Sequence, residues 1–280
     1  MKIDIFAHIC PQKYVDILNK KNNSWEKIAG TSRLNGGPAL FDTQTRLEVM
    51  KPYEDYAQVL TPTGQILEPF FPPAQADEWN RVFNDCVMEV TNQYPDKFVA
   101  AVASIQLGDI DAALRETERT LKMGFKGIHL HTPIFPYDAG RPGYNYDIIK
   151  PLDSPEFMPI YQMMAKYDLP VWIHPVGMGG VPAYPGERRG KYALFHVFGW
   201  PIESAMAMGR IVCSGILMKY PNLKFVIHHI GSAIVPALGG RIANEFDKFK
   251  AIGVLKYEKP EDDPFIKKNA ADYFKMPDDD

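Results

Sequence analysis

Histidine is the residue type whose placement in this sequence points most directly to chemistry. The seven histidines occupy positions 8, 129, 131, 174, 196, 228 and 229. Four of them, His8, His131, His174 and His229, close short apolar runs that are typical of β-strands. Neutral imidazole is a good ligand for zinc, iron, manganese or cobalt. Four imidazoles at the ends of successive strands therefore predict a metal site or a general-base cluster.

The elements that must position these histidines alternate in type along the chain. Six β-like runs are visible: Lys2–His8, Tyr56–Thr61, Phe98–Ile105, Lys126–His131, Pro170–His174 and Lys224–His229. Helical patterns separate them, as in Ile110–Lys122, Glu156–Tyr167 and Ile202–Tyr220. This alternation predicts an α/β fold, a TIM-type (β/α) barrel whose active face lies at the carboxyl ends of the strands. Because such a barrel closes with eight strands, we expect it to be incomplete at its C-terminal strands.

Side-chain alternation predicts which strand residues face the barrel interior. In the fourth run, Ile128 and Leu130 should face the helices, which points His129 and His131 inward. In the sixth run, we expect His229 to face the site and His228 to face the helix layer. Two Pro-rich stretches, Phe70–Gln75 and Pro133–Pro155, are predicted as loops.

Composition limits the classes of protein that the sequence can encode. The chain has 280 residues, 46% of them hydrophobic and 23% charged, which predicts one folded domain over residues 1–280. The net charge of −3 does not favour a nucleic-acid or anionic-membrane partner. No apolar run reaches the ~18 residues of a membrane span, and the N-terminus carries no signal-peptide pattern. We therefore expect a cytoplasmic protein that binds neither membranes nor nucleic acid.

Four segments, in order, resemble one known family. They are MKIDIFAHICP at the N-terminus, YPDKFVAAVASIQLGDIDAALRETERTLKMGFKGIHLHT, SPEFMPIYQMMAKYDLPVWIHP, and GWPIESAMAMGRIVCSGILMKYPNLKFVIHHIGS. The chain is similar to amidohydrolase-related (amidohydrolase family 2) proteins, typified by aminocarboxymuconate-semialdehyde decarboxylase and γ-resorcylate decarboxylase. The resemblance implies a barrel of the metal-dependent hydrolase superfamily.

The resemblance also implies roles for individual residues. His8 matches the second histidine of the family's HxH metal pair, and His174 matches the metal ligand of the fifth strand. His229 matches the catalytic histidine. Arg241 matches an arginine that binds substrate carboxylate in a neighbouring subunit's site. Three further residues are expected to line the substrate pocket: His131, Trp172 and His196.

Two positions depart from the family pattern. Phe6 stands where the first HxH ligand belongs, and phenylalanine cannot coordinate a metal. The family's last ligand is an aspartate on the eighth strand, and Asp278, Asp279 and Asp280 lie on no predicted strand. We therefore predict a metal site with fewer ligands than the family's full set. The predicted metal is divalent zinc, with manganese or iron as alternatives.

These expectations lead to a functional prediction. The chain is predicted to be a metal-dependent non-oxidative decarboxylase, a carbon–carbon lyase acting on an unsaturated or aromatic carboxylic acid. The alternatives are a metal-dependent hydrolase of an ester, lactone or amide, and a non-catalytic relative with a degenerate metal site. An open parallel sheet edge exposes unpaired backbone groups, so we expect a homodimer or larger homo-oligomer.

Overall fold

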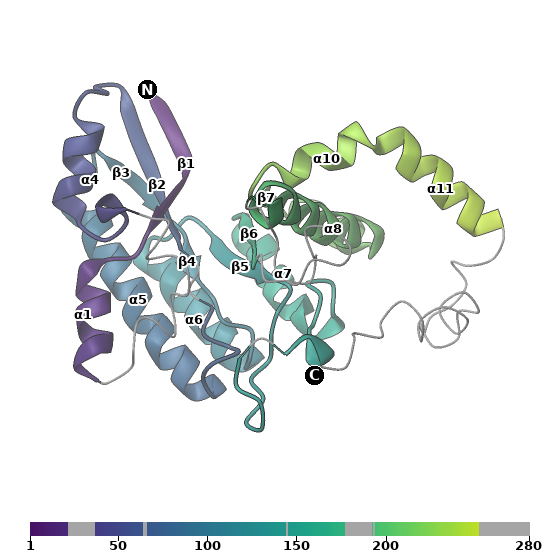
Figure 1. Cartoon of the computed structure of the whole chain (residues 1–280), viewed down its shortest axis with the longest axis horizontal. Helices are drawn as coiled ribbons and strands as arrows, with labels where there is room; N and C mark the ends of the chain where they lie inside the picture. Colours follow the sequence, from purple (N-terminus) through teal and green to yellow (C-terminus); the bar gives the residue numbers. More distant parts are fainter. Residues whose placement is uncertain (22–36, 64–65, 144, 177–191, 193, 252–280) are drawn as a thin grey trace. The chain divides into compact units, whose positions relative to one another are not determined.

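The computed structural model describes residues 1–21, 37–63, 66–143, 145–176, 192 and 194–251. The chain divides into two compact units, Met1–Ser232 and Ala233–Asp280. The first unit contains every strand found in the described residues, and the second contains most of α10 (Gly231–Ala237) and all of α11 (Gly239–Ala251) (Figure 1). Whether residues 1–280 act as one domain stays a prediction. No helix in the described ranges is long and apolar enough to cross a membrane.

Within the described residues, seven parallel strands form the centre of the first unit. In one sheet, β1 (Lys2–Ile9), β2 (Tyr56–Pro62) and β3 (Phe98–Ala101) pair in that order. The second sheet runs β4 (Ala103–Ser104), β5 (Ile128–Thr132), β6 (Val171–Pro175) and β7 (Phe225–Ile227). Consecutive neighbours joined by helices are the βα arrangement of a barrel.

The two sheets continue one another at Val102. The Val102 amide donates to the Leu60 carbonyl at 2.9 Å, and the Ala103 amide donates to the Gly127 carbonyl at 3.0 Å. The predicted third run, 98–105, is therefore one extended segment that β3 and β4 share. All six predicted β-like runs are confirmed, and within the described residues no strand follows β7.

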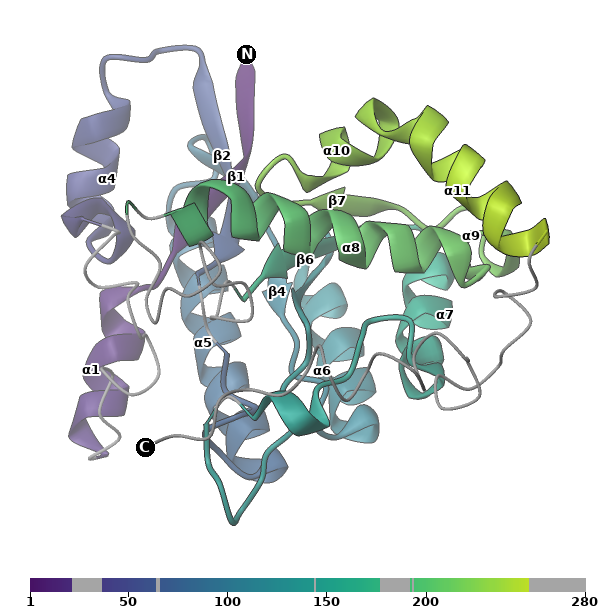
Figure 2. The same cartoon turned by 45° about the vertical axis from the view of Figure 1, so that its right-hand side comes forward.

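Helices cover the outer face of these strands. Helix α5 (Pro73–Gln93) packs on β3 and β4, and α6 (Ile110–Met123) packs between α5 and α7 (Met158–Tyr167) (Figures 1 and 2). The sequence predicts α6 well because its ends are coded locally. Asp109 caps it by accepting the Ala112 amide at 3.0 Å, and Gly124 ends it at a φ of 106°.

Two predicted boundaries are corrected. Phe70–Gln75 is only partly a loop, because α5 begins at Pro73. Proline is suited to the first helical position because the backbone N–H that it lacks would have no hydrogen-bond partner within the helix there. The helix predicted over Ile202–Tyr220 is two helices, α8 (Trp200–Cys213) and α9 (Ile216–Lys219), with Gly215 at a φ of 80° between them.

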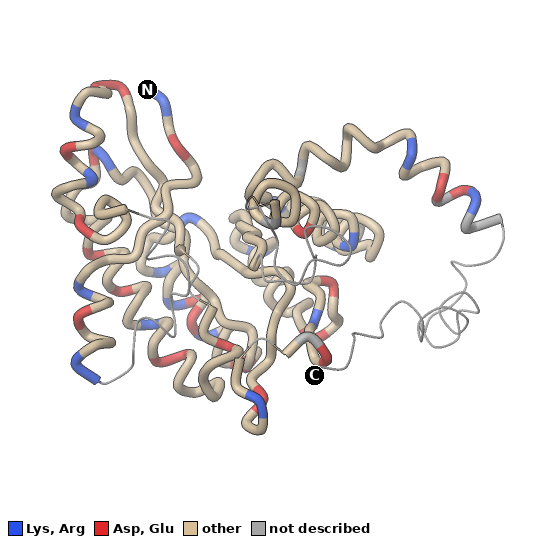
Figure 3. Tube along the Cα trace, in the orientation of Figure 1, with Lys and Arg blue, Asp and Glu red and all other residues tan. Residues whose placement is uncertain are grey.

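The remaining helices complete the outer layer of the first unit. Helix α1 (Gln12–Lys20) follows β1, and α4 (Thr43–Met50) precedes β2. Basic and acidic residues both occur along each of α1, α4, α5 and α6 (Figure 3). Ion pairs such as Lys13–Glu89 and Arg119–Asp85 link neighbouring helices. Such mixed charge is typical of a solvated helical surface.

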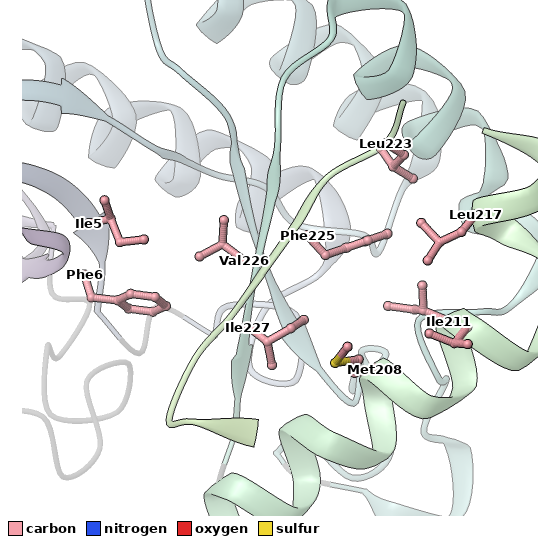
Figure 4. A pocket seen from close by; sticks show the side chains of 10 residues that line it. Ile5, Phe6, Met208, Ile211, Leu217, Leu223, Phe225, Val226 and Ile227 are labelled. Atoms are coloured by element: carbon pink, nitrogen blue, oxygen red, sulfur yellow. The ribbon is translucent and has the colours of Figure 1, made fainter. Parts of the chain in front are cut away.

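An apolar hollow of about 480 Å³ lies between β1, β7, α8 and α9 (Figure 4). Ile5 and Phe6 line it from β1, and Val226 lines it from β7. Among the described residues, β1 and β7 each pair on one side only. The hollow therefore marks the place where the sheet is open. The described residues that line it carry no titratable group, so the candidate chemistry is sought elsewhere.

Candidate metal centre

Three histidines from three strand ends meet inside the first unit. His8, His174 and His228 each place a ring nitrogen within 4.8 Å of the others. His174 and His228 are buried, and His8 is half-buried. His174 is the penultimate residue of β6, before Pro175, and His228 directly follows β7. These three side chains can hold one divalent metal ion, since neutral nitrogen donors suit zinc and its neighbours in the first transition row.

Backbone carbonyls fix which nitrogen of two of these rings faces the centre. The Nδ1 of His8 lies 2.8 Å from the Pro62 carbonyl oxygen, and the Nδ1 of His174 lies 2.6 Å from the Pro175 carbonyl oxygen. Each carbonyl requires a proton on that nitrogen, so Nε2 carries the free lone pair. A ligating histidine is commonly oriented by such a bond on its other nitrogen.

His228 gives the strongest indication that a group is bound here. It is 1% exposed, and neither ring nitrogen has a hydrogen-bond partner among the described residues. A buried polar group without a partner costs roughly 1–3 kcal/mol. A metal ion held with His8 and His174 would satisfy one of these nitrogens, so the donor set fits a metal.

The prediction that His228 faces the helix layer is wrong. Strand alternation does separate it from Phe225 and Ile227, but those two residues pack toward the helices, with the Phe225 ring 5.7 Å from the Tyr161 ring of α7. Val226 packs in the interior with Trp172, and His228 follows it inward. In β7 the apolar residues Phe225 and Ile227 therefore face the helices, which is the orientation that the sequence predicts for Ile128 and Leu130 in β5.

His229 reaches the same centre by a turn rather than by strand alternation. Its φ is 55° and that of Ile230 is 61°, so the chain leaves the extended conformation directly after His228. The Nε2 of His229 lies 3.0 Å from the Nε2 of His174. The turn is followed by Gly231, where an added Cβ would lie 2.3 Å from Ser204 Cβ. Only glycine allows the chain to pass so close to α8.

Burial keeps the clustered imidazoles uncharged. It lowers the pKa of His8, and it lowers the pKa values of His174 and His228 well below the usual range for histidine. Burial also lowers the pKa of His229 to about 4. Uncharged imidazoles repel one another less and present free lone pairs, which is the form that a metal requires.

His129 and His131 lie beside the three clustered histidines, with both rings buried. The structure confirms the inward orientation predicted for them. Their ring centroids are 4.9 Å apart, and that of His129 lies 5.7 Å from that of His174. Both nitrogens of His129 and the Nε2 of His131 have no partner in the described part of the chain. Burial lowers the pKa of His131 to about 3.

The other predicted pocket residues lie in different surroundings. Trp172 is buried among Val59, Val102 and Phe6, and its indole N–H donates to the Ile5 carbonyl at 3.2 Å. His196 belongs to the π-helical turn η4 (Phe195–Gly199) and lies against Trp200, with ring centroids 3.7 Å apart and the planes at 35°. Arg241 is exposed on α11 in the second unit. Asp278, Asp279 and Asp280 lie outside the described residues.

Phe6 occupies the interior near His228, as the resemblance implies for its position. The two ring centroids are 3.4 Å apart with the planes at 78°. The register of β1 against β2 shifts between Asp4 and Ala7. Phe6 thus places an apolar ring directly against His228, one of the three histidines.

Two residues near the centre were missed at the sequence level. Trp200 lies with its ring centroid 4.4 Å from His229 and 5.7 Å from His174. Arg46, on α4, is 7% exposed and donates to the His8 carbonyl and to Gln58 Oε1. A tryptophan at a helix start and an arginine within a helical pattern have no local sequence signal, because their roles depend on contacts distant in the chain.

Comparison with known proteins decides the family. A family model described as amidohydrolase matches residues 3–266. The chain belongs to this amidohydrolase family. The fold agrees with this assignment, because solved decarboxylases of the TIM-barrel type superimpose on the chain.

Curated amidohydrolase relatives are distant and longer. The chain is 24% identical over 261 residues to the 2-amino-3-carboxymuconate-6-semialdehyde decarboxylase of Dictyostelium discoideum, covering 88% of this chain and 67% of that protein. It is 27% identical over 201 residues to a γ-resorcylate decarboxylase of a Rhizobium species, covering 70% of this chain and 58% of that protein. The chain thus spans about six tenths to two thirds of the length of these relatives.

Solved structures of the same type share the fold. The 5-carboxyvanillate decarboxylase of Novosphingobium aromaticivorans, solved with manganese, has a TM-score of 0.68 at 22% identity and covers 92% of this chain and 72% of that one. The dihydroxybenzoic acid decarboxylase of a Polaromonas species, also solved with manganese, has a TM-score of 0.63 at 20% identity, with 86% and 68% covered.

Proposed function

We propose that the chain is a metal-dependent non-oxidative decarboxylase, a carbon–carbon lyase, of an unsaturated or aromatic carboxylic acid. The observation that carries this proposal is the meeting of His8, His174 and His228 within 4.8 Å, with His229 in contact with His174. The names of the relatives support it, since those cited above are decarboxylases. Hydrolysis of an ester, lactone or amide uses similar groups and is the nearest alternative reaction.

His8, His174 and His228 would hold the metal. A bound divalent cation supplies Lewis-acid chemistry, polarising substrate oxygens. Zinc is our first assignment from the nitrogen donors, and manganese is supported by the ion found in two structural relatives.

His229 would move the proton. When the bond between the carboxyl carbon and its neighbour breaks, carbon dioxide leaves and the electron pair stays on the neighbouring carbon. That carbon must then take up a proton. His229 stands beside the proposed metal ligands and can accept a proton from the substrate or from water and deliver it to this carbon.

The remaining predicted residues would bind the substrate. His131 carries a buried nitrogen without a partner among the described residues, which suits a substrate oxygen. His196, whose ring lies next to Trp200, would line the substrate pocket. Trp172 would help to shape that pocket. Arg241 would bind a carboxylate bidentately, reaching the site of a neighbouring subunit in an oligomer.

A second candidate, a non-catalytic relative with a degenerate metal site, is favoured by Phe6. Its ring borders His228 where a further donor would otherwise stand. Metal content separates the two candidates, because a degenerate site would leave the purified protein without a stoichiometric ion even after incubation with zinc or manganese.

The test is substrate turnover by metal-loaded protein. Protein loaded with zinc or with manganese is incubated with a panel of hydroxybenzoates and unsaturated dicarboxylates, and carbon dioxide release is recorded. We expect turnover that His229→Ala lowers by about 10²–10⁴-fold with metal content unchanged. Ile230→Ala is the matched control, since Ile230 shares the turn and is 75% exposed. Full activity of His229→Ala would refute the assignment.

We also propose that the chain forms a homodimer or larger assembly. The strands β1 and β7 each pair on one side only among the described residues. Unpaired backbone groups on a strand edge favour association. Multi-angle light scattering at micromolar concentration tests this, and a monodisperse monomer would contradict it.

A further inference from the structure

Trp200 lies against three histidines near the proposed metal. It is the first residue of α8, directly after η4. Its ring centroid is 3.7 Å from that of His196, 4.4 Å from that of His229 and 5.7 Å from that of His174. The indole therefore borders both a proposed metal ligand and the proposed proton carrier.

The indole N–H of Trp200 is buried and has no hydrogen-bond partner among the described residues. An indole N–H is only a donor, so it can be satisfied only by an acceptor. None of the neighbouring imidazoles accepts this bond. An acceptor oxygen bound within hydrogen-bond distance of this nitrogen would satisfy it.

Position distinguishes Trp200 from a similar residue. Trp79 also has a buried indole nitrogen without a partner within the described ranges, but it is 2% exposed in the core, with Lys21 over its ring. Trp200 is half-buried, and its ring centroid lies 4.4 Å from that of His229. A buried indole nitrogen without a partner does not by itself indicate a ligand. The position of Trp200 beside His174 and His229 is what distinguishes it from Trp79.

We infer that Trp200 determines substrate specificity by donating its indole N–H to a carboxylate oxygen of a planar acid. This inference rests on the proposed function and specifies its substrate. The flat indole face would pack against the substrate's planar carbon skeleton, and the N–H would select an anionic acceptor. A neutral analogue of the same shape would lose that bond and leave the donor buried without a partner.

The experiment observes the indole N–H directly. The chain has four tryptophans, so ¹⁵N-indole labelling gives four N–H signals by NMR. The protein is loaded with zinc, which is diamagnetic, and titrated with 2,6-dihydroxybenzoate, the acid found in one structural relative. Resorcinol, the same ring without the carboxylate, is the matched probe. Trp200→Phe and Trp200→Tyr identify the Trp200 signal.

We expect the Trp200 proton signal to move downfield with the acid but not with resorcinol, while the Trp79 signal stays in place. By calorimetry, Trp200→Phe should bind the acid about tenfold more weakly or worse, as expected when a charged acceptor loses one donor. Trp79→Phe should bind the acid like the unaltered protein. The NMR measurement uses the unaltered protein, so it holds even if a substitution lowers stability.

The outcomes separate this inference from the proposed function. Binding of the acid with an unmoved Trp200 signal and an unchanged affinity of Trp200→Phe overturns the role of Trp200 and leaves the decarboxylase proposal standing. Failure of the zinc-loaded protein to bind the acid contradicts the proposed substrate class, and the inference falls with it.

Discussion

The turn that carries His229 depends on a close approach at Gly231, and Gly231→Ala tests it. An added Cβ would lie 2.3 Å from Ser204 Cβ and 2.9 Å from both the Ala205 amide nitrogen and the Pro201 carbonyl oxygen. Ordinary contacts of this kind are 3.4–4 Å long. Because two of these atoms are backbone, they cannot rotate away, and α8 or the turn must shift by about 1 Å.

Forced overpacking of this kind costs about 1–3 kcal/mol, and the backbone contacts place this case near 3 kcal/mol. The backbone of Gly231 is not in the left-handed region, so alanine adds no conformational strain there. Gly209, inside α8, is the matched control because an added Cβ meets nothing within 4 Å. There alanine should raise the free energy of unfolding by about 0.5–1 kcal/mol.

Urea denaturation followed by circular dichroism measures both variants, with zinc affinity as a second readout. We expect opposite signs, namely a loss of stability and of zinc affinity for Gly231→Ala and a gain of stability with unchanged zinc affinity for Gly209→Ala. If Gly231→Ala were more stable than the unaltered protein and bound zinc with native affinity, the close approach of Gly231 to α8 would not be what positions the turn.

Two further substitutions test local features. Glu68 is 4% exposed and accepts the Leu107 amide at 2.8 Å, and burial raises the pKa of its carboxyl from 4.5 to about 7. Between these two pH values the folded state holds a proton on Glu68 that the unfolded state releases. The contribution of Glu68 to stability is therefore most favourable below pH 4.5 and is lost as the pH rises through 7. Glu68→Gln should flatten this pH dependence and raise the free energy of unfolding at pH 8 by up to about 3 kcal/mol. Equal slopes of stability against pH for the two proteins would contradict this. Phe6→His should place a donor beside His228 and tighten zinc binding by on the order of tenfold in a chelator competition, whereas an unchanged affinity would show that position 6 does not border the ion.

Much of the fold could be predicted because its signals are local. The β-like runs and the helix over Ile110–Lys122 depend on neighbouring residues, and the structure confirms them. The ends of that helix, α6, are local too, at the Asp109 cap and at Gly124. The start of α5 was missed because Pro72 and Pro73 were interpreted as a loop, although proline also begins helices.

The site was harder to predict than the fold. His8 and His174 could be placed from strand ends and from the family resemblance. The inward face of His228 followed from the packing of Phe225 on α7, a contact between segments about 60 residues apart in sequence. His229 reaches the centre through left-handed backbone angles that strand alternation cannot predict. The position of Trp200 beside His229 depends on where α8 begins in the folded chain, which no local pattern of residues indicates.

The proposed metal centre requires that His8, His174 and His228 together hold one divalent ion. Zinc stoichiometry and affinity, measured by elemental analysis and chelator competition, test this on the unaltered protein, His228→Ala and His196→Ala. We expect one zinc per chain for the unaltered protein and for His196→Ala, whose imidazole is outside the three. We expect His228→Ala to lose stoichiometric zinc while it retains its helical content. Stoichiometric zinc of native affinity in folded His228→Ala would show that these three histidines do not form the metal centre.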